Sequence, residues 1–176
     1  LDEVTLNVTE INSWKIGLTG RFAPYVNGKW ENPATMTWSS SNPEVATCED
    51  GNIVGVGAGI TVISCTKKNG TVATCTIKVL DEVTLNTTKL DGWKIGLKGR
   101  FASYVNGKWV DPATMTWSSS NPEVATCEGG NIVGVGPGTT VISCTKEYGT
   151  VATCTVTVKG LDEVTLNVTE LKDWKI

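Results

Sequence analysis

Histidine is absent from this 176-residue sequence, and so are long apolar runs. Without histidine the chain lacks the commonest general base and the commonest zinc ligand. No stretch approaches the roughly 18–20 consecutive apolar residues of a membrane-spanning helix, so we expect no membrane insertion. Charge is nearly balanced, with a net value of −3, and nothing resembles a basic footprint for nucleic acid, so we expect no nucleic-acid partner. No secretory signal precedes Leu1, so we interpret the sequence as a mature product, an excised fragment or the ordered part of a longer chain.

The polar and glycine-rich motifs of the sequence provide no catalytic group, so we predict that the protein is not an enzyme. The serine run Ser39–Ser41 has no histidine and no suitable lysine beside it to activate a nucleophile, and turn chemistry explains it. The glycines of Gly55–Gly59 resemble a phosphate loop, but a β-branched strand follows where a helix N-terminus is required. There is no C-x-x-C pair, and the sequence predicts neither a metal site nor a cofactor.

An internal repeat determines the organisation of the chain. The segment LDEVTLN occurs at Leu1, Leu80 and Leu161. Residues 1–79 and 80–158 align without a gap, with 63 identities in 79 positions. We therefore expect two complete repeats and the start of a third, with bounds 1–79, 80–160 and 161–176.

The third copy ends at Ile176, and two explanations are open for it. Either the sequence belongs to a longer covalent array, or residues 161–176 complete a domain in a neighbouring molecule by strand addition. Because each complete repeat carries its own first strand, we favour the covalent array.

The residue pattern within each repeat is that of an all-β protein. Runs of Val, Thr and Ile alternate with Gly, Asn and Pro, which is typical of short strands and turns. Seven such strands in about 80 residues predict tandem immunoglobulin-like antiparallel β-sandwiches. In the first of them we expect four buried residues, Met36, Trp38, Ile63 and Ile77. The only helical candidate is a single turn at Glu10–Lys15.

The later half of each repeat carries a family resemblance. The string TWSSSNPEVATCEDGNIVGVGAGITVISCTKKNGTVATCTIKV, from Thr37 to Val79, resembles the bacterial immunoglobulin-like domain, group 2. That repeat occurs in invasin- and intimin-type surface proteins and in some phage structural proteins. The second copy, from Thr116 to Val158, matches equally well, whereas the earlier WKIGLTGRFAPYVNGKW departs from the pattern. The resemblance implies an extracellular or cell-surface location.

Each repeat contains three cysteines, which suggests an oxidising compartment. A three-residue loop at Asn69–Thr71 would place Cys65 opposite Cys75, and the resemblance also puts these two on neighbouring strands. The favoured disulfides are therefore Cys65–Cys75 and Cys144–Cys154. Two alternatives are open: Cys48, or Cys127 in the second repeat, bonds to one of the others across the sheets, or all are buried reduced thiols.

Several surface residues are candidates for contacts. Trp38 and Trp117 are expected in the core, whereas four others either seal junctions and loop edges or form an exposed platform for a sugar, a partner subunit or an attached glycan: Trp14, Trp30, Trp93 and Trp109. The acidic pair that opens each repeat, as in Asp2–Glu3, is interpreted as solvated charge rather than as calcium ligands. The glycosylation pattern Asn-x-Thr occurs at Asn7, Asn69, Asn86 and Asn167.

These features predict a structural role outside the cell. Val79 runs into Leu80 with almost no linker, so successive domains should be held stiffly, as in a stalk, fibre or adhesin shaft. The expected partners are neighbouring repeats or subunits in a head-to-tail array. The alternatives are a module that binds glycans or a surface receptor, and an accessory array of a larger secreted enzyme.

Overall fold

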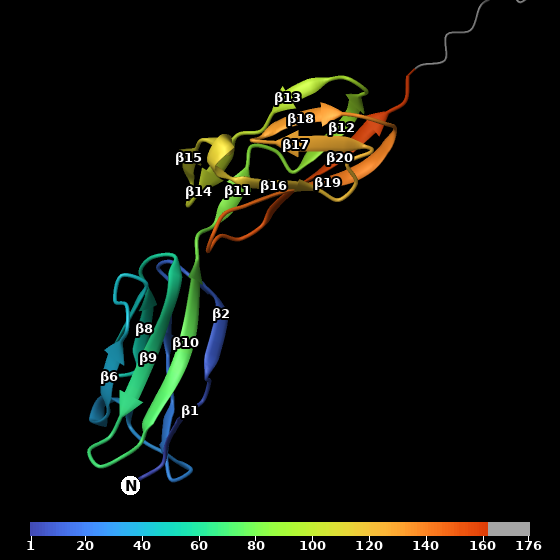
Figure 1. Ribbon diagram of the computed structural model, residues 1–176. Coiled ribbons are helices and arrows are strands. Elements are labelled where there is room, and N and C mark those ends of the chain that lie inside the picture. The colour runs from blue at the N-terminus through green and yellow to red at the C-terminus, as the bar shows by residue number, and fades with distance from the viewer. Residues whose placement is uncertain (162–176) are drawn as a thin grey trace, which may run out of the picture.

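The computed structural model describes residues 1–161. Its strands form two immunoglobulin-like sandwiches that follow each other along the chain (Figure 1), and each sheet takes its strands from one of them only. The predicted all-β class is confirmed. Within the described residues the only helical elements are the short 3-10 turns Pro33–Thr35 and Pro112–Thr114. None of these residues forms a helix with the length and apolar character needed to cross a bilayer.

The first sandwich is built from one four-stranded and two three-stranded sheets. Its strands are β1 (Val4–Leu6), β2 (Glu10–Lys15), β3 (Thr19–Arg21), β4 (Pro24–Val26), β5 (Lys29–Trp30), β6 (Thr37–Ser40), β7 (Ala46–Glu49), β8 (Asn52–Gly55), β9 (Gly59–Thr66) and β10 (Val72–Leu80). The large sheet has the order β2-β10-β9-β6. The two small sheets, β1-β4-β5 and β3-β8-β7, form the other layer.

The second sandwich repeats this arrangement. Its strands are β11 (Val83–Leu85), β12 (Lys89–Lys94), β13 (Lys98–Arg100), β14 (Ser103–Val105), β15 (Lys108–Val110), β16 (Thr116–Ser119), β17 (Ala125–Glu128), β18 (Asn131–Gly134), β19 (Gly138–Thr145) and β20 (Ala152–Lys159). The sheet orders are β12-β20-β19-β16, β11-β14-β15 and β13-β18-β17.

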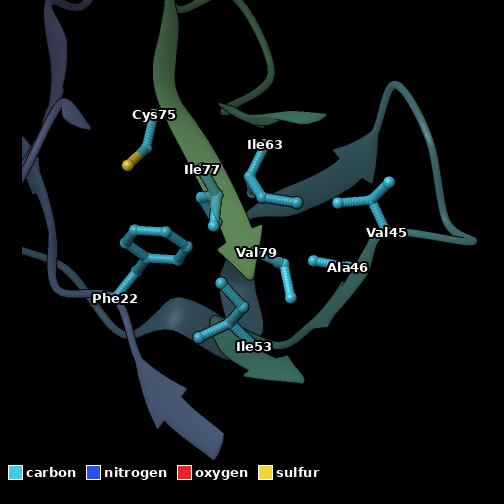
Figure 2. Packing of buried hydrophobic residues seen from close by; sticks show 8 residues of the cluster. All are labelled: Phe22, Val45, Ala46, Ile53, Ile63, Cys75, Ile77 and Val79. Atoms are coloured by element: carbon cyan, nitrogen blue, oxygen red, sulfur yellow. The ribbon is translucent and has the colours of Figure 1, made fainter. Parts of the chain in front are cut away.

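The core lies between the layers because apolar residues alternate along the long strands. In β9 and β10 every second side chain points inward, as the period of a half-buried strand requires. Ile63 and Ile77 are fully buried and Met36 is 6% exposed, as predicted, whereas Trp38 is only partly buried. The larger half of the core (Figure 2) comprises Phe22, Val45, Ala46, Ile53, Ile63, Cys75, Ile77 and Val79.

The second and last strands of each sandwich depart from the predicted antiparallel pairing. Strand β2 runs parallel to β10, and β12 runs parallel to β20. The segment Glu10–Lys15, which was the helical candidate, forms β2. Ile11 and Trp14 of this strand both pack against the core. Their spacing of three residues fits a strand because the register shifts between them, which is the effect of a β-bulge.

Candidate functional site at the repeat junction

The chain passes from the first sandwich to the second without a free residue. Leu80 is the last residue of β10 and pairs with Lys15 of β2. The next residue, Asp81, is only 7% exposed. Its N–H donates to the carbonyl oxygen of Tyr148 at 2.8 Å, and its own carbonyl accepts from the N–H of Thr150 at 2.9 Å. Asp81 is therefore already held by the β19–β20 hairpin of the second sandwich.

The side chain of Asp81 is held as firmly as its backbone. Asn106 Nδ2 donates to Asp81 Oδ1 at 2.7 Å, and Lys146 Nζ donates to Oδ2 at 2.5 Å. Thr150 Oγ1 accepts the N–H of Val83 at 2.9 Å. We call these four residues the repeat-start clamp of the second sandwich: Asp81, Asn106, Lys146 and Thr150. Three separate segments thus converge on the residue at which the second sandwich begins.

Electrostatics favour the ionised form of Asp81. Burial by itself would raise the pKa of this carboxyl, but the hydrogen bonds from Lys146 and Asn106, together with the lysine charge, outweigh that effect. The pKa of Asp81 is therefore lowered from its ordinary value of 3.8. A buried carboxylate needs such partners to offset the loss of hydration.

The first sandwich has the same clamp with one difference. Asn27 Nδ2 donates to Asp2 Oδ1 at 2.9 Å, and Thr71 Oγ1 accepts the N–H of Val4 at 2.8 Å. The equivalent lysine, Lys67, instead forms an ion pair with Glu31 at 2.9 Å. Position 31 is a valine in the second repeat, Val110, so Lys146 has no carboxylate there.

Sequence reasoning missed the clamp. The acidic pairs were interpreted as solvated charge, and this is wrong for Asp81, which is buried. Its partners lie 25 and 65 residues away in sequence, so no local spacing indicates them. The one local signal is the Asn-Gly turn. Asn27 and Asn106 both have φ of +49°, a left-handed conformation that asparagine tolerates, and this turn aims their side chains at the repeat start.

A small pocket of about 80 Å³ lies at the junction. Residues of both sandwiches line it: Lys15, Ile16, Leu80, Glu82, Asn106 and Thr150. The junction with the third copy is built differently. Lys94 and Ile95 correspond to Lys15 and Ile16, but Lys159 and Gly160 are inserted before Leu161, and Lys159 takes the ladder position of Leu80 by pairing with Lys94.

The four tryptophans that are candidates for contacts fall into two classes. Trp14 packs against the core, and its indole N–H donates to the Leu18 carbonyl at 3.0 Å. A Cβ at Gly20 would lie 2.6 Å from its ring, so glycine is needed there. Trp93 repeats these contacts in the second sandwich. Trp30 and Trp109 are 62% and 63% exposed. Of the four, only these two are exposed as a contact platform requires.

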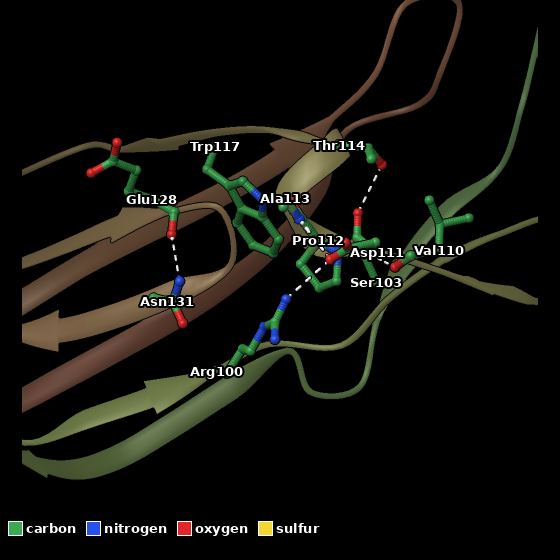
Figure 3. A network of polar contacts seen from close by, with 10 residues as sticks. All are labelled: Arg100, Ser103, Val110, Asp111, Pro112, Ala113, Thr114, Trp117, Glu128 and Asn131. Atoms are coloured by element: carbon green, nitrogen blue, oxygen red, sulfur yellow. Dashed lines mark hydrogen bonds and ion pairs between the residues drawn. The ribbon is translucent and has the colours of Figure 1, made fainter.

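Trp38 and Trp117 seal the edge of the core beside the 3-10 turns. The indole N–H of Trp117 donates to the Pro112 carbonyl at 2.8 Å, and its ring stacks on Phe101 with centroids 5.4 Å apart. Asp111 accepts from the N–H of Ala113 and pairs with Arg100 at 3.0 Å (Figure 3). These polar contacts fix the 3-10 turn against the core.

All six cysteines are free thiols in the structure. The expected opposition of Cys65 and Cys75 is wrong, because Cys65 pairs with Ala73 and Cys75 with Ile63. The loop between β9 and β10 spans five residues rather than three, which offsets the two cysteines by two positions. Burial raises the pKa of Cys65 and Cys75 to about 11 and that of Cys48 to about 12.

The second repeat shows the same state. Cys144 and Cys154 are fully buried, and Cys127 is partly buried. Burial raises the pKa of Cys144 to about 11 and that of Cys127 to about 12. A thiol reacts through its thiolate, so burial favours the protonated, less reactive form of these cysteines near neutral pH.

The candidate glycosylation positions carry structural roles. Asn7 and Asn86 are exposed, and their Oδ1 atoms accept the backbone N–H of Ala23 at 2.8 Å and of Ala102 at 2.9 Å. Asn69 lies in a turn with φ of +62°. Asn167 lies outside the described residues. Use of these sites for glycans stays a prediction.

The remaining polar motif is explained by turn geometry. Ser40 Oγ lies 2.9 Å from Thr61 Oγ1, which also accepts the N–H of Asn42 at 2.9 Å. Ser41 Oγ accepts the N–H of Val62. The serine run thus ties a turn to β9. Among the described residues no cluster of three or more Asp, Glu, His or Cys is placed to hold a metal ion.

The chain is similar in architecture to several solved structures. Domains 4 and 5 of the surface-layer protein SbsC match at 17% identity over 90% of this chain and 98% of that one, with a TM-score of 0.37. The intimin fragment in complex with the translocated intimin receptor matches at 13% identity over 89% and 63%, with a TM-score of 0.45. This chain spans 27% of a longer SbsC structure. No protein-family model and no curated protein matches the chain. Likenesses this distant say nothing about function.

Proposed function

We propose that this chain is a stretch of an extracellular shaft, in which immunoglobulin-like repeats joined end to end hold another domain away from a surface. One observation carries the proposal. Leu80 is held in the ladder of the first sandwich and Asp81 in the clamp of the second, so the connection has no free residue. Reorientation of one sandwich relative to the other is limited to the torsions beside a single planar peptide bond. A flexible linker would leave each domain free to tumble.

The proposal includes the division of the array. Residues 1–80 and 81–160 are independent folding units, with the boundary one residue later than the sequence repeat, because Leu80 belongs to β10. The copy that begins at Leu161 starts a further unit of a longer covalent array. The resemblance to the bacterial immunoglobulin-like domain, group 2, supports a cell-surface location for such an array.

Small-angle X-ray scattering tests the stiffness of the junction. The comparison variant carries Gly-Ser-Gly-Ser inserted between Leu80 and Asp81, which leaves both sandwiches intact. We expect the native chain to scatter as a single elongated particle and the insertion variant to require an ensemble with a broad range of dimensions. A native chain whose scattering requires an ensemble as broad as that of the variant contradicts the proposal.

Surface location is tested on intact cells of the source. Antibodies against the purified chain should label unpermeabilised cells, and external protease should remove the label. Label that is reached only after permeabilisation contradicts an extracellular role.

A second function, binding of glycans or a surface receptor, is favoured by one specific observation. Trp30 and Trp109 are more than 60% exposed. Each pairs across strands with a tyrosine, Tyr25 or Tyr104, on the outer face of its three-stranded sheet. Exposed aromatic rings of this kind supply large contact area on few torsions. Screening the chain and its Trp30→Ala/Trp109→Ala double variant on a glycan array tests this function. Equal signals from both proteins would show that these two tryptophans do not bind glycans.

A further inference from the structure

Trp30 and Trp109 differ from the other tryptophans that the structure describes in having no structural task. Each of the other four donates its indole N–H to a backbone carbonyl oxygen at 2.8–3.1 Å: Trp14, Trp38, Trp93 and Trp117. The indole N–H groups of Trp30 and Trp109 donate to no residue between 1 and 161, and both side chains are largely exposed. Neither core packing nor hydrogen bonding within the described fold accounts for these two rings.

Trp30 ends a row of three outward-facing side chains on the sheet β1-β4-β5. Thr5 is opposite Tyr25, and Tyr25 is opposite Trp30. The neighbouring Val4 and Val26 are buried, so the alternation of a strand turns the three residues of the row toward solvent. Because adjacent strands lie about 4.8 Å apart, the row spans about 10 Å across the sheet.

The second repeat carries the same row on the sheet β11-β14-β15. Thr84 is opposite Tyr104, and Tyr104 is opposite Trp109. Val83, which precedes Thr84 on β11, is buried. The chain therefore presents the row twice, once on each sandwich.

The hairpin that carries the two aromatic rings of a row is fixed at its turn. Asn27 lies in the turn between β4 and β5. Its Oδ1 accepts the N–H of Glu3 at 2.9 Å, and its Nδ2 donates to Asp2 Oδ1 at 2.9 Å. Asn106 makes the equivalent bonds in the second sandwich. A ligand that binds such an ordered hairpin has little conformational entropy to remove.

No charged residue lies in either row. Lys29 is opposite the buried Val26 and therefore belongs to the other face of the sheet. Lys108 has the same place in the second repeat, opposite Val105. A carboxylate or phosphate group on a ligand would lose hydration at the row without gaining a cation.

The residue types of the row fit an uncharged sugar chain. Aromatic rings offer large apolar contact area on few torsions, and the threonine and tyrosine hydroxyls and the indole N–H supply hydrogen-bonding groups. A pyranose ring has the complementary pattern, with C–H groups on its faces and hydroxyls around its edge. Rings that are joined through equatorial bonds, as in cellulose, β-mannan and chitin, form an extended and flat chain, which matches a straight row.

We infer that each row binds an uncharged polysaccharide whose rings are joined through equatorial bonds, and that residues 1–161 carry two equivalent sites of this kind. The inference rests on the proposed second function, binding of glycans. It deepens that function by specifying the class of ligand and the number of sites.

A titration of the ¹⁵N-labelled full chain, followed by NMR, tests the inference through the indole N–H signals. The probes are cellohexaose, mannohexaose and chitohexaose. Two further probes each change one property: maltohexaose joins glucose through axial bonds, and hexamannuronate adds a carboxylate to each ring of mannohexaose. The four internally bonded tryptophans are controls within the same spectrum.

We expect at least one of the first three probes to shift the signals of Trp30 and Trp109 and to leave the other four in place. The same concentrations of maltohexaose and hexamannuronate should bind at least about tenfold more weakly, because shape or an unpaired charge disfavours them. Trp30→Ala should remove one site and leave the binding curve reported by Trp109 unchanged.

The double variant Trp30→Ala/Trp109→Ala should weaken binding at least about tenfold, with the backbone amides of Thr5 and Thr84 as reporters. Val72→Ala/Val151→Ala is the matched control, because these side chains are 60% and 62% exposed and lie outside the rows. This control should bind as the native chain does.

Two kinds of result would overturn the inference. If maltohexaose or hexamannuronate shifts Trp30 and Trp109 as strongly as the other probes, the ligand class is wrong, although glycan binding by the rows stands. If no probe shifts these signals, neither the inference nor glycan binding by the rows stands, whether the rows then bind a protein or nothing. The scattering test of the junction is unaffected by either result.

Discussion

The two repeats share one clamp but give one lysine different partners. In the first repeat Lys67 pairs with Glu31, and both side chains are about one-third exposed. In the second, Lys146 pairs with Asp81, whose side chain is 10% exposed. The exchange of Glu31 for Val110 accounts for the difference, because it removes the competing carboxylate. Val110 thus leaves Lys146 available to the residue at which the second sandwich begins.

The largest expected effect tests whether the two sandwiches fold independently. Ile63→Ala removes a fully buried side chain from the first core and should destabilise that sandwich by about 3–4 kcal/mol. Ile142→Ala is the matched change in the second core. Hydrogen exchange should show lost protection only in the sandwich that carries the change. Equal loss in both sandwiches would mean that residues 1–80 and 81–160 do not form separate units.

The second-largest expected effect comes from removing the clamp carboxylate, which should destabilise the second sandwich more than the first. Asp81→Ala leaves Lys146 and Asn106 without their partner, and we expect the second sandwich to lose about 2–3 kcal/mol of unfolding free energy. Asp2→Ala should cost the first sandwich about 1 kcal/mol, because Lys67 keeps Glu31. Denaturant titration with a probe in each sandwich measures both values. A larger loss for Asp2→Ala would contradict the assigned role of Lys146.

The clamp should also make the second sandwich sensitive to acid. The folded pKa of Asp81 is lowered, so its contribution to stability is complete above the unfolded value and is lost as the pH falls through the folded value. The difference in unfolding free energy between the native chain and Asp81→Asn should therefore shrink as the pH is lowered from about 5 to about 2. A constant difference across that window would show that the carboxylate charge is not what stabilises the clamp.

The smallest expected effect comes from exchanging Glu31 and Val110, which occupy equivalent positions in the two repeats. Val110→Glu offers Lys146 the partner that Lys67 has, and Glu31→Val removes it from Lys67. The reciprocal variants should exchange the two lysine orientations in a crystal structure, and stability should change by less than about 1 kcal/mol because the pairs are partly exposed. If Lys146 stays on Asp81 in Val110→Glu, the geometry of β15 rather than competition selects the partner.

The sequence predicts the sandwich and its buried positions because burial follows strand period. Cys65 and Cys75 illustrate the limit. The β9–β10 loop has five residues where three were expected, which shifts the register by two positions. A shift of two keeps every side chain on its face and changes every partner. The predicted burial of Met36, Ile63 and Ile77 is therefore confirmed, whereas the expected opposition of Cys65 and Cys75 is wrong.

The clamp was out of reach for a different reason. Asp81, Asn106 and Lys146 are brought together only when β11, the β14–β15 turn and the β19–β20 hairpin meet at one end of the sandwich. No local sequence propensity predicts that these three segments come together. A comparison of the repeats does contain a hint, since Asn27, Thr71 and their equivalents are unchanged while Glu31 is not.

Amide ¹⁵N relaxation of the full chain tests the central claim, that the clamp leaves the junction no free residue, most directly. The native chain should fit one anisotropic rotational diffusion tensor for both sandwiches, and Asp81→Ala, with the entry residue released, should require two. If the native sandwiches already tumble with separate tensors, the junction is flexible and the account of a stiff shaft is contradicted.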